Sequence, residues 1–138
     1  GMDCARRFSM SDLLYKKALE IVGKFELDGF SGNSAGAVGC ALLSAKHNIY
    51  TGICIDVACS LGFCAEHAAV AEMLKNRETQ IAMIVAVNEA GDILPPCGRC
   101  RELMIQVDKN NLNTLVMIDN GNTMKLKDLI PEIWVNKF

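Results

Sequence analysis

The chain has no excess of positive charge and few aromatic residues. Its 138 residues include 14 lysines and arginines against 16 aspartates and glutamates, so the formal net charge is −2, and only 6% of the residues are aromatic. Proteins that bind polynucleotides neutralise phosphates with clustered cations, and those that bind single strands also stack bases on aromatic rings. These absences disfavour a nucleic acid polymer as partner and favour a small molecule.

The sequence also lacks long apolar runs. None approaches the roughly 18 residues of a membrane span, and no charged-then-apolar signal segment opens the chain. Seven cysteines is an odd number, which is typical of reduced thiols. We therefore expect a cytoplasmic protein with no membrane partner. The length predicts one domain over residues 1–138, in which Gly1 before Met2 is interpreted as a remnant of expression.

Apolar periodicity predicts helices and strands in alternation. A helical repeat begins at Ser11-Asp12, interpreted as an N-cap, and ends near Val22. Further helices are predicted over residues 64–75, 97–109 and 126–130. Strands are predicted over residues 38–45, 49–57, 81–87 and 115–118, and the glycine-rich segment 29–36 and residues 120–122 are predicted as loop and turn. This alternation favours an α/β domain with a mixed sheet.

Two short motifs carry the chemistry. Cys64-Ala65-Glu66 and Pro96-Cys97-Gly98-Arg99-Cys100 each lie where a loop gives way to a predicted helix. We expect Cys64, Cys97 and Cys100 in the first turns of these helices, where free N–H groups favour thiolates. Three thiolates can hold one Zn²⁺ and leave the fourth tetrahedral position open for water.

Glu66 follows Cys64 by two residues, which places its carboxylate near the metal without making it a ligand. Zinc lowers the pKa of a bound water to near 7. Glu66 would take the proton of that water, pass it to a ring nitrogen and then protonate the departing amine. Such a metal and carboxylate pair is the machinery of the zinc deaminases that act on nucleobases.

Two other interpretations of the cysteines stay open at this point. The Cys97–Cys100 pair has the spacing of a redox dithiol, although the neighbouring prolines and the Cys64–Glu66 motif argue against it. A structural zinc site would need a fourth ligand, for which His67 and Cys59 are candidates. That interpretation leaves Glu66 without a role.

Together the two motifs closely resemble the cytidine deaminase family of the three-cysteine type. The likeness extends to VGCALL at residues 38–43 and to LIPEIW at residues 129–134, so it covers most of the chain from about Ala37 to Trp134. The resemblance implies a three-layer α/β/α fold with a five-stranded mixed sheet and one Zn²⁺ per subunit. It also implies a hydrolase of pyrimidine salvage that converts cytidine or deoxycytidine to uridine or deoxyuridine and ammonia.

The same resemblance implies a homotetramer whose active sites are shared between subunits. Trp134 matches a C-terminal aromatic residue that stacks on the base in a neighbouring subunit. The backbone N–H of Ala65 matches the group that binds the base carbonyl. The backbone carbonyl of Pro95 matches the group that binds the exocyclic amine. The last two roles do not depend on the side chain.

The chain departs from the family pattern at four positions. Cys54 and Asp56 stand where an asparagine and a glutamate grip the ribose, and a thiol is a weak hydrogen-bonding group. Gly36 stands where an aromatic wall is usual, and His67 stands where an arginine offsets the thiolate charge. Blasticidin S deaminase, a member that acts on a modified cytosine nucleoside, shares PCGRCR and is one alternative. A non-catalytic zinc protein of the same fold is another.

Overall fold

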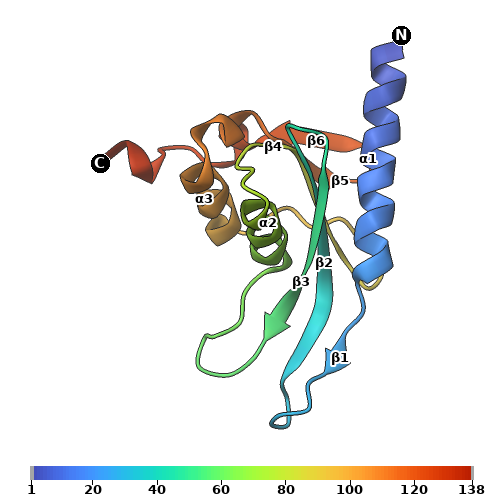
Figure 1. The fold of residues 1–138 in the computed structure, drawn as a ribbon, viewed down its shortest axis with the longest axis vertical. Helices are drawn as coiled ribbons and strands as arrows, with labels where there is room; N and C mark the ends of the chain where they lie inside the picture. The colour runs from blue at the N-terminus through green and yellow to red at the C-terminus, as the bar shows by residue number, and fades with distance from the viewer. Residues whose placement is uncertain (1, 138) are drawn as a thin grey trace.

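A mixed β-sheet lies between two helical layers in the computed structural model, which describes residues 2–137 (Figure 1). Helix α1 (Met2–Ile21) covers one face of the sheet, and α2 (Ala65–Lys75) and α3 (Gly98–Val107) cover the other. This confirms the predicted α/β class and its three layers. No helix within these residues combines the length and the apolar composition needed to cross a membrane.

The sheet has six strands within the described residues. They are β1 (Phe25–Glu26), β2 (Ser34–Ser44), β3 (Ile49–Asp56), β4 (Ile81–Asn88), β5 (Leu115–Asp119) and β6 (Asn122–Lys125). β2 pairs with β3 along one edge and with β1 and then β4 along the other, and β5 and β6 follow. Only β4 and β5 run parallel among these pairs.

The described residues form one strand more than the five that the resemblance implies and two more than the four that apolar periodicity predicts, because β1 and β6 are short. β6 has one apolar residue in four, and it forms by backbone pairing with β5 across the predicted turn. β1 is two exposed residues long. Backbone pairing of this kind leaves no period-two pattern in the sequence.

Three predicted boundaries were wrong by two residues or more. α1 begins at Met2 rather than at Ser11, because the intervening residues include no glycine or proline to stop the helix. β2 begins at Ser34, inside the predicted loop. The helix predicted over 97–109 ends at Val107, because the Asp108 side chain accepts a hydrogen bond from the Asn110 N–H and starts a 3₁₀ helix, η1 (Lys109–Asn113).

Alternate residues of β2 build the two halves of the core. Leu42 faces α2 and α3, where it is buried with Val70 of α2 and Met104 of α3. Ala41 faces the opposite way and is buried with Leu14 of α1. This is the period-two alternation of a sheet that is covered on both sides.

Close packing of α2 on the sheet sets the position of the first cysteine motif. Gly52 of β3 faces α2, and a Cβ atom there would lie 2.4 Å from the Ala69 backbone nitrogen. Any larger residue would push the helix away from the strand. The absence of a side chain at residue 52 therefore fixes how deeply the N-terminus of α2 lies over the sheet.

Candidate metal centre and substrate cavity

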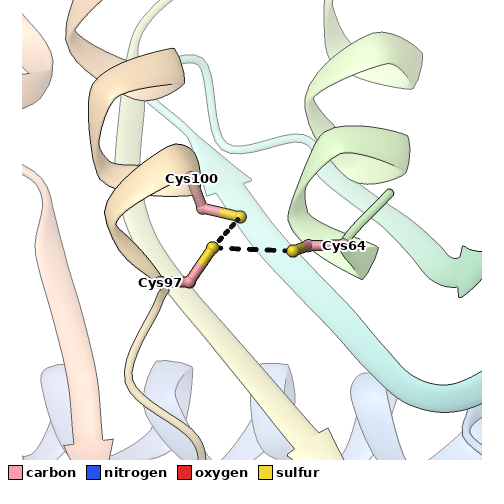
Figure 2. A group of neighbouring side chains, drawn as sticks. All are labelled: Cys64, Cys97 and Cys100. Atoms are coloured by element: carbon pink, nitrogen blue, oxygen red, sulfur yellow. Dashed lines mark hydrogen bonds between the residues drawn. The ribbon is translucent and has the colours of Figure 1, made fainter. Parts of the chain in front are cut away.

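Three cysteine side chains converge between the N-termini of α2 and α3 (Figure 2). Cys64 is the N-cap residue of α2, Cys97 is the N-cap residue of α3, and Cys100 lies in the first turn of α3. The Sγ atom of Cys97 lies 3.5 Å from that of Cys64 and 3.5 Å from that of Cys100. Two of the three cysteines thus precede the first turn in which they were expected.

This donor set fits one zinc ion. The three sulfur atoms lie within 4.8 Å of one another. Tetrahedral Zn–S bonds of ~2.3 Å put sulfurs about 3.8 Å apart, so the cluster has the right size. No histidine, aspartate, glutamate or fourth cysteine of the described part of the chain joins the group. Cys59, one candidate for a fourth ligand, is exposed in a loop.

The three thiols differ in their proton affinity. Burial raises the pKa of Cys64 and of Cys100, and the Glu66 carboxylate adds to the effect at Cys100. At Cys97 burial acts in the same direction, but hydrogen bonds from the Cys100 backbone, from the Cys100 and Cys64 thiols and from the Arg99 backbone outweigh it and hold the pKa below its usual value. The N-terminus of α3 thus favours one thiolate, and a bound Zn²⁺ displaces the protons of the other two.

Glu66 lies in the first turn of α2 beside this cluster. Its side chain is 5% exposed. Burial raises the pKa of its carboxyl group, whereas its own backbone N–H and the Cys100 thiol act in the opposite direction. A buried carboxyl group with a raised pKa exchanges protons closer to neutral pH, as a general acid and base must.

His67 lies beside the cluster rather than in it. Its Nδ1 atom lies 3.5 Å from the Cys100 Sγ atom, and its ring stacks on Phe63 at a centroid distance of 6.2 Å. Burial and, secondarily, the charge of Arg99 lower the pKa of His67. The imidazole is therefore a neighbour of a zinc ligand.

A cavity of about 490 Å³ opens over the cysteines. This is within the usual range for small-molecule sites, roughly 300–1,000 Å³. Its walls include Cys54 and Asp56 from β3, Ala65 and Glu66 from α2, and Pro95 from the loop before α3. The structure thus brings together every candidate site residue except Trp134.

Trp134 does not line this cavity. It begins the C-terminal 3₁₀ helix η3 (Trp134–Lys137), and its side chain is 55% exposed. Arg99, expected from the sequence to offset the thiolate charge together with or instead of Arg101, does line the cavity. Sequence reasoning missed Phe63, which also lines it, and its position next to Cys64 was the available signal.

The β3 wall of the cavity holds an unusual pair of polar groups. The Val38 N–H donates a hydrogen bond to the Cys54 Sγ atom at 3.3 Å. The Cys54 thiol in turn lies 3.8 Å from an oxygen of Asp56. The thiol is therefore occupied by the protein itself, and the exposed Asp56 carboxylate is the stronger acceptor for a ligand.

Comparison with known proteins identifies the family. Residues 14–116 match the family model of the cytidine and deoxycytidylate deaminase zinc-binding region. The chain is 31% identical over 98 residues to a cytidine deaminase of Mycobacterium tuberculosis, covering 70% of this chain and 71% of that protein.

Solved structures agree. The crystal structure of cytidine deaminase from M. tuberculosis matches with a TM-score of 0.72 and 26% identity, covering 89% of this chain and 95% of that one. Cytidine deaminase from Burkholderia pseudomallei matches with a TM-score of 0.71 and 25% identity, covering 89% and 98%. The chain belongs to the cytidine and deoxycytidylate deaminase family, and the cluster of Cys64, Cys97 and Cys100 fits the one zinc ion of that family.

Proposed function

We propose that this chain is a zinc-dependent hydrolase that deaminates a free cytosine nucleoside, cytidine or deoxycytidine, to uridine or deoxyuridine and ammonia. One observation carries the proposal: a buried carboxyl group, Glu66, lies beside a three-thiolate metal site at the wall of a cavity of about 490 Å³. Family membership supports the same conclusion.

Glu66 is the proton carrier of the reaction. When bound, Zn²⁺ supplies a water whose pKa is lowered enough for it to act as the nucleophile near neutral pH. Glu66 accepts a proton from that water and gives it to the ring nitrogen beside the reacting carbon, which makes the carbon electrophilic. The oxygen of the water bonds to that carbon, Glu66 carries the second proton of the water to the amine, and the C–N bond breaks as ammonia leaves. The sum is one water consumed and one ammonia released.

Two backbone groups orient the base. The N–H of Ala65 donates a hydrogen bond to the base carbonyl, and the carbonyl of Pro95 accepts one from the exocyclic amine. Both residues line the cavity, Ala65 directly after Cys64 and Pro95 two residues before Cys97. A backbone donor and a backbone acceptor hold the ring so that its amine-bearing carbon faces the metal.

Asp56 and Cys54 bind the sugar. The Asp56 carboxylate accepts a hydrogen bond from a sugar hydroxyl, and Cys54, already engaged with the Val38 N–H, shapes the wall behind it. The blasticidin S alternative is not favoured, because the relatives and structures that match are cytidine deaminases. A non-catalytic protein is not favoured either, because Glu66 is present and buried.

Trp134 serves the active site of a neighbouring subunit in a homotetramer, where its indole stacks on the base. Its exposure and its position outside its own cavity support this arrangement. The chain acts as one catalytic domain in the cytoplasm, where it serves pyrimidine salvage. Reducing conditions there keep the three cysteines from forming disulfides.

The direct test is to load the protein with one equivalent of zinc and incubate it with cytidine and with deoxycytidine. Uridine formation is followed by ultraviolet absorbance, and ammonia by a coupled assay. We expect equal amounts of both products. Zinc-loaded, folded protein that binds nucleoside and releases no ammonia would refute the proposal.

A further inference from the structure

One arginine connects two segments of the chain. They are the loop between β4 and α3 (residues 89–97), called the metal loop below, and the C-terminal segment (residues 129–137). Arg101, in α3 and half-buried, donates a hydrogen bond from Nε to the Pro96 carbonyl at 2.7 Å. The same guanidinium donates from Nη1 to the Leu129 carbonyl, also at 2.7 Å. These two carbonyls belong to segments more than 30 residues apart in the chain.

The loop before α3 has few backbone donors near Cys97. The Leu94 N–H bonds to the Ala86 carbonyl of β4, but the next two residues, Pro95 and Pro96, have no N–H group. Hydrogen bonds can therefore hold these two residues only through their carbonyls. The bond from Arg101 holds the carbonyl that directly precedes the zinc ligand Cys97.

The second contact holds the base of the segment that carries Trp134. Leu129 ends the 3₁₀ helix η2 (Leu126–Leu129), and the chain then passes through Pro131 to Trp134. Pro131 again removes a backbone donor. The hydrogen bond to the Leu129 carbonyl thus holds the chain against α3 five residues before Trp134.

We propose that Arg101 is a positioning residue that sets the metal loop and the Trp134 segment in a fixed relation to each other. The planar guanidinium donates two hydrogen bonds in different directions, from Nε to the Pro96 carbonyl and from Nη1 to the Leu129 carbonyl. A lysine ammonium at the end of a flexible stem cannot reproduce both. The effect on turnover rests on the proposed function, because Pro95 and Trp134 are assigned there to the substrate.

The test compares Arg101→Lys and Arg101→Gln with the parent protein and with Arg77→Lys. Arg77 is exposed beyond the end of α2, so it controls for the loss of a guanidinium. The first measurement is the rate of zinc transfer to a chromophoric chelator. The second is acrylamide quenching of fluorescence from Trp134, the only tryptophan of the chain. The third is kcat and KM for cytidine.

We expect both Arg101 variants to lose zinc faster, by about 10-fold, as for other changes next to metal ligands. We also expect stronger quenching of Trp134 and a lower kcat, whereas Arg77→Lys matches the parent protein. Should Arg101→Gln not fold, Arg101→Lys decides. A folded Arg101→Lys protein with the parental rate of zinc transfer or parental quenching overturns the proposal. An Arg101→Lys protein that does not fold also overturns it, because Arg101 would then serve the stability of the whole fold.

The first two measurements need no substrate. If they change as expected in a protein that never deaminates cytidine, the positioning role stands and the proposed function fails. If cytidine is deaminated and neither measurement changes, the proposed function stands and the positioning role of Arg101 fails.

Discussion

At the scale of single residues, the metal site combines thiols with opposite tendencies. The N-terminus of α3 lowers the pKa of Cys97, whereas burial raises the pKa of Cys100. The Cys100 side chain is fully buried in the first turn of α3. Zinc binding would require it as a thiolate, so metal affinity and folding are linked through this residue.

Replacing Cys100 with alanine should remove both the metal and part of the stability. Two thiolates cannot hold Zn²⁺ as three do, and the stabilisation that metal binding contributes is lost with it. We expect elemental analysis to find little zinc and a chelator to leave the melting temperature unchanged. Cys59→Ala, at an exposed cysteine outside the cluster, is the control. A stoichiometric zinc content in Cys100→Ala would contradict the assignment.

Gly36 has no room for the aromatic side chain that the family resemblance implies at this position. Its φ angle is +87°, and a Cβ atom there would lie 2.2 Å from the Gly23 carbonyl oxygen. No side chain fits at this position while the Gly23 N–H bonds to the Gly36 carbonyl. In the proposed reaction, an aromatic ring that stacks on the base would come from elsewhere, such as Phe63 or a neighbouring subunit.

At the scale of elements, a carboxylate ties the β2–β3 hairpin to the loop before β4. Buried Glu78 accepts hydrogen bonds from the Ser44 hydroxyl at 2.6 Å, from the Asn48 amide at 2.9 Å and from the Tyr50 hydroxyl. The bonds from Ser44 and then Tyr50 lower the pKa of Glu78. This cluster closes the hairpin that carries Cys54 and Asp56 at its other end.

The lowered pKa of Glu78 predicts an acid-sensitive stability. A carboxyl group whose pKa is lower in the folded state stabilises the protein above its unfolded pKa, about 4.3, and this contribution is lost as pH falls through the folded value. We expect Glu78→Gln to be less stable than the parent protein in urea at pH 7. The difference should shrink below about pH 4, again from the ordinary glutamate pKa. Glu89→Gln, at an exposed site, is the control, and a pH-independent difference would contradict the linkage.

Elements with their own apolar signal were predictable from the sequence. The continuous apolar run at residues 81–87 became β4 almost unchanged, and the cysteine spacing placed all three zinc ligands at helix starts. β6 could not be predicted, because it depends on pairing with β5. The contact from Arg101 to Leu129 could not either, because no local pattern encodes a bond between residues 28 apart.

At the scale of the whole molecule, the cavity and Trp134 belong to different parts of the surface. The cavity lies at the N-termini of α2 and α3, and the C-terminal segment extends away from the body of the fold (Figure 1). The proposed place of Trp134 in the cavity of a neighbouring subunit predicts that activity depends on assembly.

Mixing two impaired variants should test this sharing. Trp134→Ala should lower kcat/KM and keep its zinc, and Glu66→Gln should be nearly inactive. Subunits exchanged between them should regain activity, because some sites then combine an intact Glu66 with an intact neighbouring Trp134. Glu66→Gln mixed with Cys100→Ala is the control for defects within one subunit. No gain over the separate proteins, with exchange verified by native mass spectrometry, would refute a shared site.

The central claim is that Glu66 moves protons at a zinc site it does not ligate. The decisive measurement is cytidine turnover by zinc-loaded Glu66→Gln, with zinc content and melting temperature determined on the same sample and Glu72→Gln, also in α2, as control. We predict one zinc per subunit, a near-parental melting temperature and turnover reduced by about 10²–10⁴-fold, the usual contribution of such a group. Turnover close to that of the parent protein, with zinc bound, would contradict the account.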